Sequence, residues 1–216
     1  MATIPILRES AAPEDLTWHL VAVCERVAAL IALLLIAPVL LVSAAVIATL
    51  SRRTPLIAHR RVGWRGSTLW MVKLRTMWDG APRRSGWIER IDDACGPARK
   101  HPADPRVKSA FARFCRRHSI DELPQLWHVV RGEMSLIGPR PLTVREIRQY
   151  YGEAAEETLQ LKPGIAGLWQ TSGRNRLTYE ERRRMDLEFV RRRSLRMYLR
   201  IAGRTIPEIF SGANTW

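Results

Sequence analysis

The chain has 216 residues, 46% of them hydrophobic, and a formal net charge of +14, because 35 Lys and Arg outnumber 21 Asp and Glu. This length provides one compact domain plus an appendage and excludes two ordinary domains. The three cysteines are far apart and form no Cys-x-x-Cys pair, which indicates a reducing compartment and predicts no zinc site. The basic excess predicts a nucleic-acid partner, an anionic membrane surface or an anionic substrate.

An apolar run covers residues 27–50, about 24 residues without a charge. As a helix it would be ~36 Å long, enough to reach across a bilayer. It is too long for the h-region of a signal peptide, so we expect it to be retained. The sequence therefore predicts an amphipathic juxtamembrane segment over residues 1–26, a membrane segment over residues 27–50, and a cytoplasmic domain over residues 51–216.

Pro38 lies near the middle of the apolar run, where a proline removes a backbone hydrogen bond and bends or breaks a helix. Two arrangements follow: a kinked helix that spans the bilayer, or a helix-break-helix that enters and leaves through the same face. Arg52, Arg53, Arg60 and Arg61 follow the run. The positive-inside tendency therefore places the bulk of the chain in the cytoplasm.

A β-hairpin is predicted after the membrane segment. Residues 54–58 lead into a glycine-punctuated turn, and residues 67–74 alternate apolar and polar side chains as a half-buried strand does. Residues 79–104 are rich in Gly, Pro and charge, which predicts a loop. Helical spacing returns over residues 106–115, where three apolar residues share a face: Val107, Phe111 and Phe114.

Two adjacent carboxylates, Asp121 and Glu122, interrupt this basic chain. Ser119, with Glu122 three residues later, fits a capping box, although Pro124 allows a first turn that begins nearer Leu123. In either register the carboxylates lie at the positive end of a helix dipole, where phosphate or a charged transition state can be held. Neighbouring cations would keep Asp121 ionised and nucleophilic at neutral pH.

The arginine-rich stretch over residues 182–200 has apolar residues at helical spacing. It is interpreted either as an amphipathic helix on an anionic membrane surface or as a core-packed helix with a solvated arginine face. Because an apolar anchor precedes it, lipid is the favoured partner and nucleic acid is not expected.

Four separated motifs resemble those of a known family. They are residues 73–77 (KLRTM), 119–142 (SIDELPQLWHVVRGEMSLIGPRPL), 162–170 (KPGIAGLWQ) and 172–175 (SGRN). Together they resemble the bacterial sugar transferase family, the small monotopic phosphoglycosyl transferases. Residues 167–175 and 204–207 are most similar to members that begin exopolysaccharide synthesis.

The resemblance implies an enzyme of the bacterial inner membrane that transfers sugar-1-phosphate from a UDP-sugar to a polyprenyl phosphate and releases UMP. The expected fold is α+β and mostly helical. A re-entrant membrane helix, a short β-hairpin and surface amphipathic helices would surround one small catalytic domain, which faces the cytoplasm and can form a homo-oligomer. The alternative is a membrane-tethered basic module that binds nucleic acid or anionic lipid, with the acid pair as a mere helix cap.

The resemblance also assigns roles to residues. Asp121 would be the nucleophile that forms a covalent aspartyl phosphosugar, and Glu122 would hold the Mg²⁺ that bridges the diphosphate. The cations expected to bind the phosphates and uridine of the substrate are Lys73, Arg116, Arg140 and Arg174.

Some residues depart from the family pattern. The pair that breaks the membrane helix is Ala37-Pro38 rather than Ser-Pro, so the serine hydroxyl is missing. Tyr198 replaces the acid of the motif Ser-Leu-x-x-Asp-Leu. Ala112 and Phe189 stand where Gly and Tyr are usual, and both are expected to be packing changes.

Overall fold

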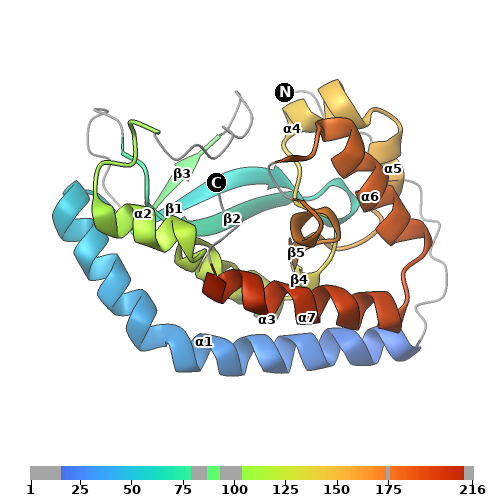
Figure 1. Ribbon diagram of the computed structural model, residues 1–216, viewed down its shortest axis with the longest axis horizontal. Coiled ribbons are helices and arrows are strands. Elements are labelled where there is room, and N and C mark those ends of the chain that lie inside the picture. The colour runs from blue at the N-terminus through green and yellow to red at the C-terminus, as the bar shows by residue number, and fades with distance from the viewer. Residues whose placement is uncertain (1–15, 79–86, 93–103, 174–175, 212–216) are drawn as a thin grey trace.

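The computed structural model describes residues 16–78, 87–92, 104–173 and 176–211. One long helix runs along the lower edge of Figure 1, and a small sheet and several shorter helices lie above it. The fold is therefore α+β and mostly helical, as the sequence predicts.

The long helix, α1, extends over Leu16–Ser51 and contains Pro38. It begins before the predicted membrane segment, so residues 16–26 belong to the same helix, while residues 1–15 lie outside the described part of the chain. Figure 1 shows α1 as one bent helix, and a proline inside a helix is a common cause of a bend. The predicted helix-break-helix is thus a continuous, bent helix in this structure.

Only one face of α1 is covered by the rest of the protein. Buried residues recur at helical spacing, from Glu25 and Ala29 to Ser43 and Ile47. The opposite face exposes large apolar side chains, and Leu35 is 75% exposed. Among the described residues, α1 is the one helix long and apolar enough to cross a membrane. An exposed apolar face of this extent indicates membrane association rather than the core helix of a soluble protein.

A three-stranded sheet in the order β2-β1-β3 follows α1. β1 (Leu56–Val62) and β2 (Thr68–Leu74) pair antiparallel over their whole length and confirm the predicted hairpin. The connection includes a 3-10 turn, η1 (Trp64–Gly66). Gly66 has a φ of +78°, a left-handed conformation that favours glycine. The second strand delivers Lys73 to the end of the hairpin.

β3 (Ile88–Ile91) pairs parallel with the other side of β1. It lies within residues 79–104, so the prediction of a loop is wrong for this strand. Four residues are too few for a clear periodic signal, and β3 owes its conformation to pairing with β1 rather than to its own pattern. Residues 79–86 and 93–103 lie outside the described residues.

α2 (Ala110–Arg117) begins at Ser109, whose hydroxyl accepts a hydrogen bond from the backbone N–H of Ala112 at 3.0 Å. The helix is present but begins at Ala110 rather than Arg106, and the three apolar residues predicted to share a face are not equally buried. Phe114 is 51% exposed, whereas Ala112 and Cys115 are fully buried. Two small side chains thus lie on the buried face of α2, and the helix contacts η2.

A short 3-10 helix, η2 (Ile120–Gln125), leads directly into α3 (Leu126–Val130). α3 packs against α1, because Val129 and Met134 share a buried cluster with Ala29. The segment after α2 is therefore fixed to the membrane-associated helix.

A second, two-stranded sheet pairs β4 (Ser135–Ile137) in parallel with β5 (Gly164–Ala166). The elements between and just after the two strands are α4 (Val144–Glu146), η3 (Ile147–Tyr151), α5 (Ala154–Thr158) and η4 (Trp169–Thr171). Gly138 lies beside Gly164, and the absence of side chains allows the two backbones to approach closely. This contact fixes the turn that follows β4.

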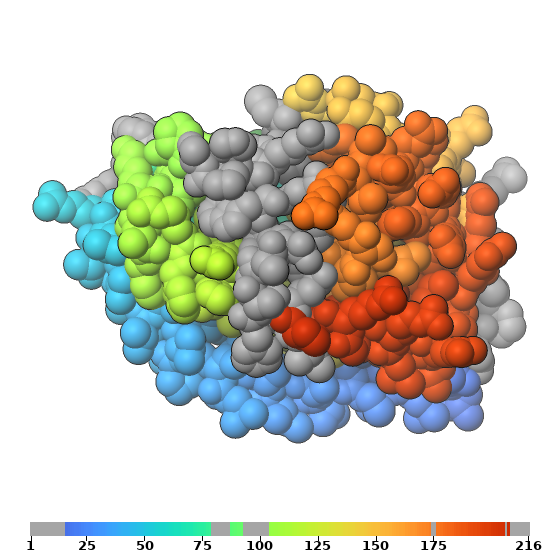
Figure 2. All heavy atoms as spheres, in the orientation of Figure 1, coloured from blue at the N-terminus to red at the C-terminus, as the bar shows by residue number. Residues whose placement is uncertain are grey.

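Two helices end the described chain: α6 (Tyr179–Arg191) and α7 (Leu195–Ser211). The stretch 182–200 is thus not one helix, and the interpretation of a core-packed helix holds for α6. α6 packs into the protein and buries Asp186 and Phe189. α7 lies alongside α1 in Figure 1, and in Figure 2 the atoms of α1 form a continuous band below it.

We expect Gly164→Ala to destabilise the protein severely. A Cβ at this position would lie 2.7 Å from the carbonyl oxygen of Ala166 and even closer to the Gly138 backbone, and the paired strands leave neither group free to move. The loss should be about 2 kcal/mol or more in thermal unfolding of the detergent-solubilised protein. Gly203→Ala in α7 is the matched control, because its Cβ meets nothing within 4 Å. Equal melting temperatures for both variants would contradict the close approach.

Candidate active site

The acid pair lies in η2, directly after a residue with a left-handed backbone. Ser119 has a φ of +55°, and its side chain makes no capping hydrogen bond, so the predicted capping box is wrong. Instead, the backbone N–H of Glu122 donates to the Ser119 carbonyl at 3.0 Å. Asp121 is only 3% exposed. The left-handed turn at Ser119 thus places Asp121 inside the protein, while both carboxylates lie in the first turn of η2, the helix end at which the sequence predicts them.

Lys73 of β2 forms an ion pair with Glu122. The Lys73 Nζ lies 2.9 Å from the Glu122 Oε1, and the two side chains are 15% and 16% exposed. β2 is an edge strand of its sheet, and it also contacts η2. Because both charges are largely withdrawn from water, the Coulomb attraction between them is less screened than in an ordinary surface pair.

His128 of α3 fixes β2 beside the acid pair. Its Nε2 accepts a hydrogen bond from the backbone N–H of Val72 at 3.1 Å, and its Nδ1 lies 2.6 Å from the Glu133 Oε2. From this network the proton is assigned to Nδ1, which donates to Glu133. Val72 precedes Lys73, so His128 holds the strand that carries the lysine.

Arg116 of α2 is a second cation of this region. It is 7% exposed, and its Nη1 donates a long hydrogen bond of 3.4 Å to the Thr76 hydroxyl. Thr76 comes just after β2, and α2 contacts η2. α2, η2 and the end of the hairpin therefore meet where the acid pair lies.

Cys115 is a buried thiol next to this junction. Burial, and after it the negative charge of Asp121, raises the pKa of Cys115 to about 11. At neutral pH the thiol is therefore protonated and a poor nucleophile. Of these two side chains, the Asp121 carboxylate is the better candidate for nucleophilic chemistry.

Arg140 belongs to a second group of side chains, around Trp169. Its guanidinium lies 5.7 Å from the centre of the Trp169 ring, and that of Arg182 lies 4.6 Å from the same ring. Asp186 is 0% exposed and accepts a hydrogen bond of 2.7 Å from the Tyr151 hydroxyl. A buried carboxylate thus lies among cations that would otherwise repel each other.

Burial raises the pKa of Asp186 to about 7. The Tyr151 hydroxyl, the backbone N–H and charge of Arg140, and the Trp169 indole act in the opposite direction, because each favours the ionised carboxylate. Burial and the nearby carboxylate also raise the pKa of Tyr151, so this phenol keeps its proton and remains the donor.

The cations that the sequence predicts for substrate binding thus lie in two different regions, the acid pair and the surroundings of Trp169. Lys73 and Arg116 come to the junction that holds the acid pair, whereas the described contacts of Arg140 lie around Trp169. Arg174 lies outside the described residues. Sequence reasoning missed the roles of Tyr151 and Trp169, for which the only signal was the position of Trp169 inside a family motif.

The acid pair offers the oxygen ligands that Mg²⁺ prefers. Within the described ranges, no group of three or more His, Cys, Asp or Glu side chains gathers that could hold a metal alone. Mg²⁺ is commonly bound through one or two carboxylates together with substrate phosphates and water. Asp121 and Glu122 provide such oxygens, so the donor set fits an ion that arrives with, or is completed by, a diphosphate.

Comparison with known proteins identifies relatives over nearly the whole chain. The family model described as bacterial sugar transferase matches residues 17–212. The exopolysaccharide production protein ExoY of Sinorhizobium fredii is 36% identical over 185 residues, which cover 84% of this chain and 81% of the relative. A UDP-glucose:undecaprenyl-phosphate glucose-1-phosphate transferase of Caulobacter vibrioides is 33% identical over 90% of this chain and 71% of the relative. An undecaprenyl-phosphate galactose phosphotransferase of Salmonella typhimurium is 47% identical over 41% of this chain and 18% of the relative.

Asp186 should make stability depend on pH. Its raised pKa means that the folded protein binds this proton more tightly than the unfolded chain, so stability should fall as pH rises from about 4 to about 7, by about 1.4 kcal/mol for each unit of pKa difference. Asp186→Asn should remove this fall in chemical denaturation measured at several pH values. Glu188→Gln, an exposed acid in the same helix, should keep it. An identical pH profile for wild type and Asp186→Asn would contradict the assignment.

Proposed function

The chain belongs to the bacterial sugar transferase family, and from this premise we propose that it transfers sugar-1-phosphate from a UDP-sugar to a polyprenyl phosphate and releases UMP. The observation that carries the proposal is the acid pair of η2, in which Asp121 is buried and Glu122 pairs with Lys73. η2 itself contacts α1. The printed names of two relatives, a glucose-1-phosphate transferase and a galactose phosphotransferase acting on undecaprenyl phosphate, support this class of reaction.

Asp121 is the proposed nucleophile. Its carboxylate attacks the phosphorus that bears the sugar, the bond from that phosphorus to UMP breaks, and an aspartyl phosphosugar remains. A phosphate oxygen of the polyprenyl phosphate then attacks the same phosphorus. The bond to Asp121 breaks, which restores the carboxylate and leaves a polyprenyl diphosphate sugar.

The surrounding cations have a simple role in this scheme. Phosphoryl transfer mostly requires positioning and compensation of negative charge. Lys73 and Arg116 would bind phosphate oxygens at the junction, and Lys73 also orients Glu122. When bound by Glu122 and the diphosphate, Mg²⁺ would neutralise charge that develops on the leaving UMP. Arg140 would bind the substrate from the turn after β4.

α1 is proposed to re-enter the cytoplasmic leaflet of the inner membrane rather than to span the bilayer. Its buried face runs from Glu25 to Ile47, so both halves of the helix lie against the same globular part. A spanning helix packed in this way would draw that part into the hydrocarbon core, where its polar groups would be unsatisfied. The bend of α1 supports re-entry at a shallow depth.

α7 is the proposed contact with anionic lipid. Leu195 and Leu199 are 46% and 59% exposed, one helical turn apart. Exposed arginines flank them at positions 196, 200 and 204. An amphipathic helix with this pattern lies in the headgroup region, with its leucines toward the acyl chains. α7 also lies beside α1, which supports a common membrane face (Figure 1).

The alternative function, a basic binding module without catalysis, requires the acid pair to be a helix cap. Ser119 forms no capping box with Glu122, and Glu122 pairs with Lys73 instead. The observations therefore favour the enzyme.

Purified protein supplied with Mg²⁺, polyprenyl phosphate and a panel of UDP-hexoses should release UMP with at least one of them. The panel also identifies the sugar, which the fold does not specify. UMP release is measured against time for each donor, with and without the lipid phosphate. A folded protein that releases no UMP from any donor would count heavily against the proposal.

Asp121→Asn is the decisive variant in this assay, because an amide is a far poorer nucleophile than a carboxylate. UMP release should fall by about a thousandfold or more. Glu188→Gln is the control, since it removes one exposed carboxylate elsewhere. Wild-type turnover by a folded Asp121→Asn protein would show that another group carries the chemistry.

A further inference from the structure

Glu25 is a buried carboxylate in the N-terminal third of α1, just before the apolar run over residues 27–50. It is 6% exposed and accepts hydrogen bonds from two other elements. The Ser135 hydroxyl and the Leu136 backbone N–H of β4 donate to its Oε1 at 2.6 and 2.8 Å. The Tyr198 hydroxyl of α7 donates to the same oxygen at 2.7 Å. Since a buried charge is tolerated only with such donors, these contacts hold α1, β4 and α7 together.

The contact with β4 has a defined geometry. β4 faces β5 through Ser135 and Ile137, and the backbone N–H of Ser135 donates to the Pro163 carbonyl. The intervening N–H, that of Leu136, points to the opposite edge of the strand, where Glu25 accepts it. The Ile137 N–H also donates to the same oxygen, at 3.4 Å, so Glu25 accepts backbone hydrogen bonds from two consecutive residues of β4.

β4 leads directly into the turn that carries Arg140. The Gly138 N–H donates to the Ala166 carbonyl at 2.9 Å, and the Gly164 N–H donates to the Pro139 carbonyl at 2.8 Å. The turn is therefore held on one side by β5. On its other side, β4 is held by Glu25, so displacement of Glu25 would shift the strand and the turn together.

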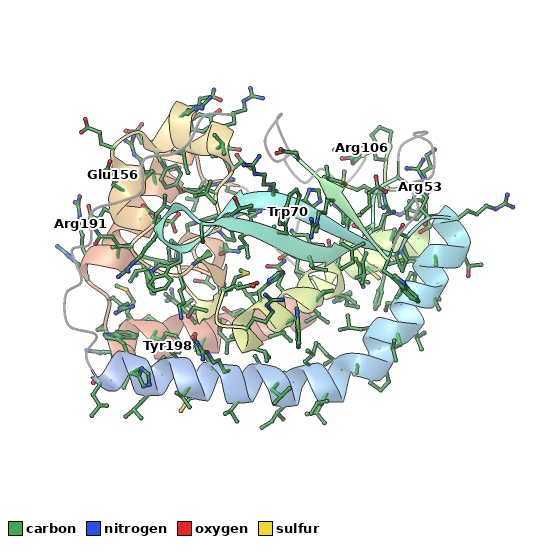
Figure 3. The ribbon with its side chains drawn as sticks, turned by 180° about the vertical axis from the view of Figure 1, so that it is seen from behind. Arg53, Trp70, Arg106, Glu156, Arg191 and Tyr198 are labelled. Atoms are coloured by element: carbon green, nitrogen blue, oxygen red, sulfur yellow. The ribbon has the colours of Figure 1, made fainter. Side chains whose placement is uncertain are left out.

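Tyr198 suits this place because it is a donor that keeps its proton. Burial, and then the Glu25 carboxylate, raises the pKa of Tyr198 well above its ordinary value. Its ring also meets Trp18 edge to face at 6.4 Å, and the Arg193 guanidinium lies 3.8 Å from the centre of the Trp18 ring. Figure 3 labels Tyr198 where α7 lies beside α1. The acid found at this position of the family motif would be shorter and, when ionised, could not donate to Glu25.

We propose that Glu25 and Tyr198 are positioning residues that form a joint between the membrane-associated helices and the turn that carries Arg140. The joint sets the place of the Arg140 guanidinium relative to α1 and α7. Its consequence for catalysis rests on the proposed function, in which Arg140 binds the substrate. The joint itself is a property of the fold and can be tested without turnover.

Hydrogen exchange tests the joint directly. In Glu25→Gln and in Tyr198→Phe, the amides of Gly138 and Arg140 should exchange about 10-fold faster or more than in wild type, while those of β1 and β2 keep their rates. Tyr150→Phe and Glu188→Gln are matched controls and should match wild type throughout. Unchanged exchange at Gly138 and Arg140 would overturn the proposal. So would an equal acceleration across the whole protein, which would indicate general loss of stability.

Steady-state kinetics of the Glu25 and Tyr198 variants then distinguish a role in positioning Arg140 from a role in stability alone. Each joint variant should raise KM for the UDP-sugar by about 10-fold, with a smaller change in kcat. In an Arg140→Lys background the same substitutions should add little, because they act through Arg140. Full additivity would overturn the link between the joint and Arg140. Wild-type kinetics of Arg140→Lys would instead contradict the proposed role of Arg140, while hydrogen exchange would still decide on the joint.

Discussion

α1 has one face that packs on the rest of the protein and an opposite face that is apolar and exposed. This division constrains the rest of the molecule. Ala29 shares a buried cluster with Val129 and Met134, so α3 cannot move relative to α1 without opening that cluster. η2 leads straight into α3, and the acid pair is thereby held at a fixed place above the helix. In the proposed reaction a lipid-borne acceptor and a water-soluble donor must both reach this place.

The cations at the acid pair and those around Trp169 have different partners. At the acid pair, Lys73 is matched by one carboxylate in a largely desolvated ion pair. Around Trp169, the guanidinium groups of Arg140 and Arg182 share one aromatic ring. Attraction to that ring and to the buried Asp186 offsets their mutual repulsion. At the acid pair the carboxylates match the cations in number, whereas around Trp169 two guanidinium groups share one carboxylate and leave positive charge for an anionic substrate.

Features with a local signal could be predicted from the sequence: the apolar helix, the hairpin that delivers Lys73, and the acid pair. Features that depend on distant partners could not. β3 exists because β1 pairs with it, and the left-handed Ser119 replaces the predicted capping box because tertiary packing overrides a local cap. Glu25 has no local signal, because its hydrogen-bond partners lie more than a hundred residues away in the sequence.

The central claim is that Asp121 becomes covalently bonded to the phosphosugar. The most direct measurement is mass spectrometry of protein incubated with Mg²⁺ and a UDP-sugar that it turns over, without the lipid acceptor. Our account predicts a mass increase of one sugar phosphate, located on the peptide that contains Asp121 and removed when polyprenyl phosphate is added. Turnover without an adduct on that peptide, or a stable adduct on another residue, would contradict it.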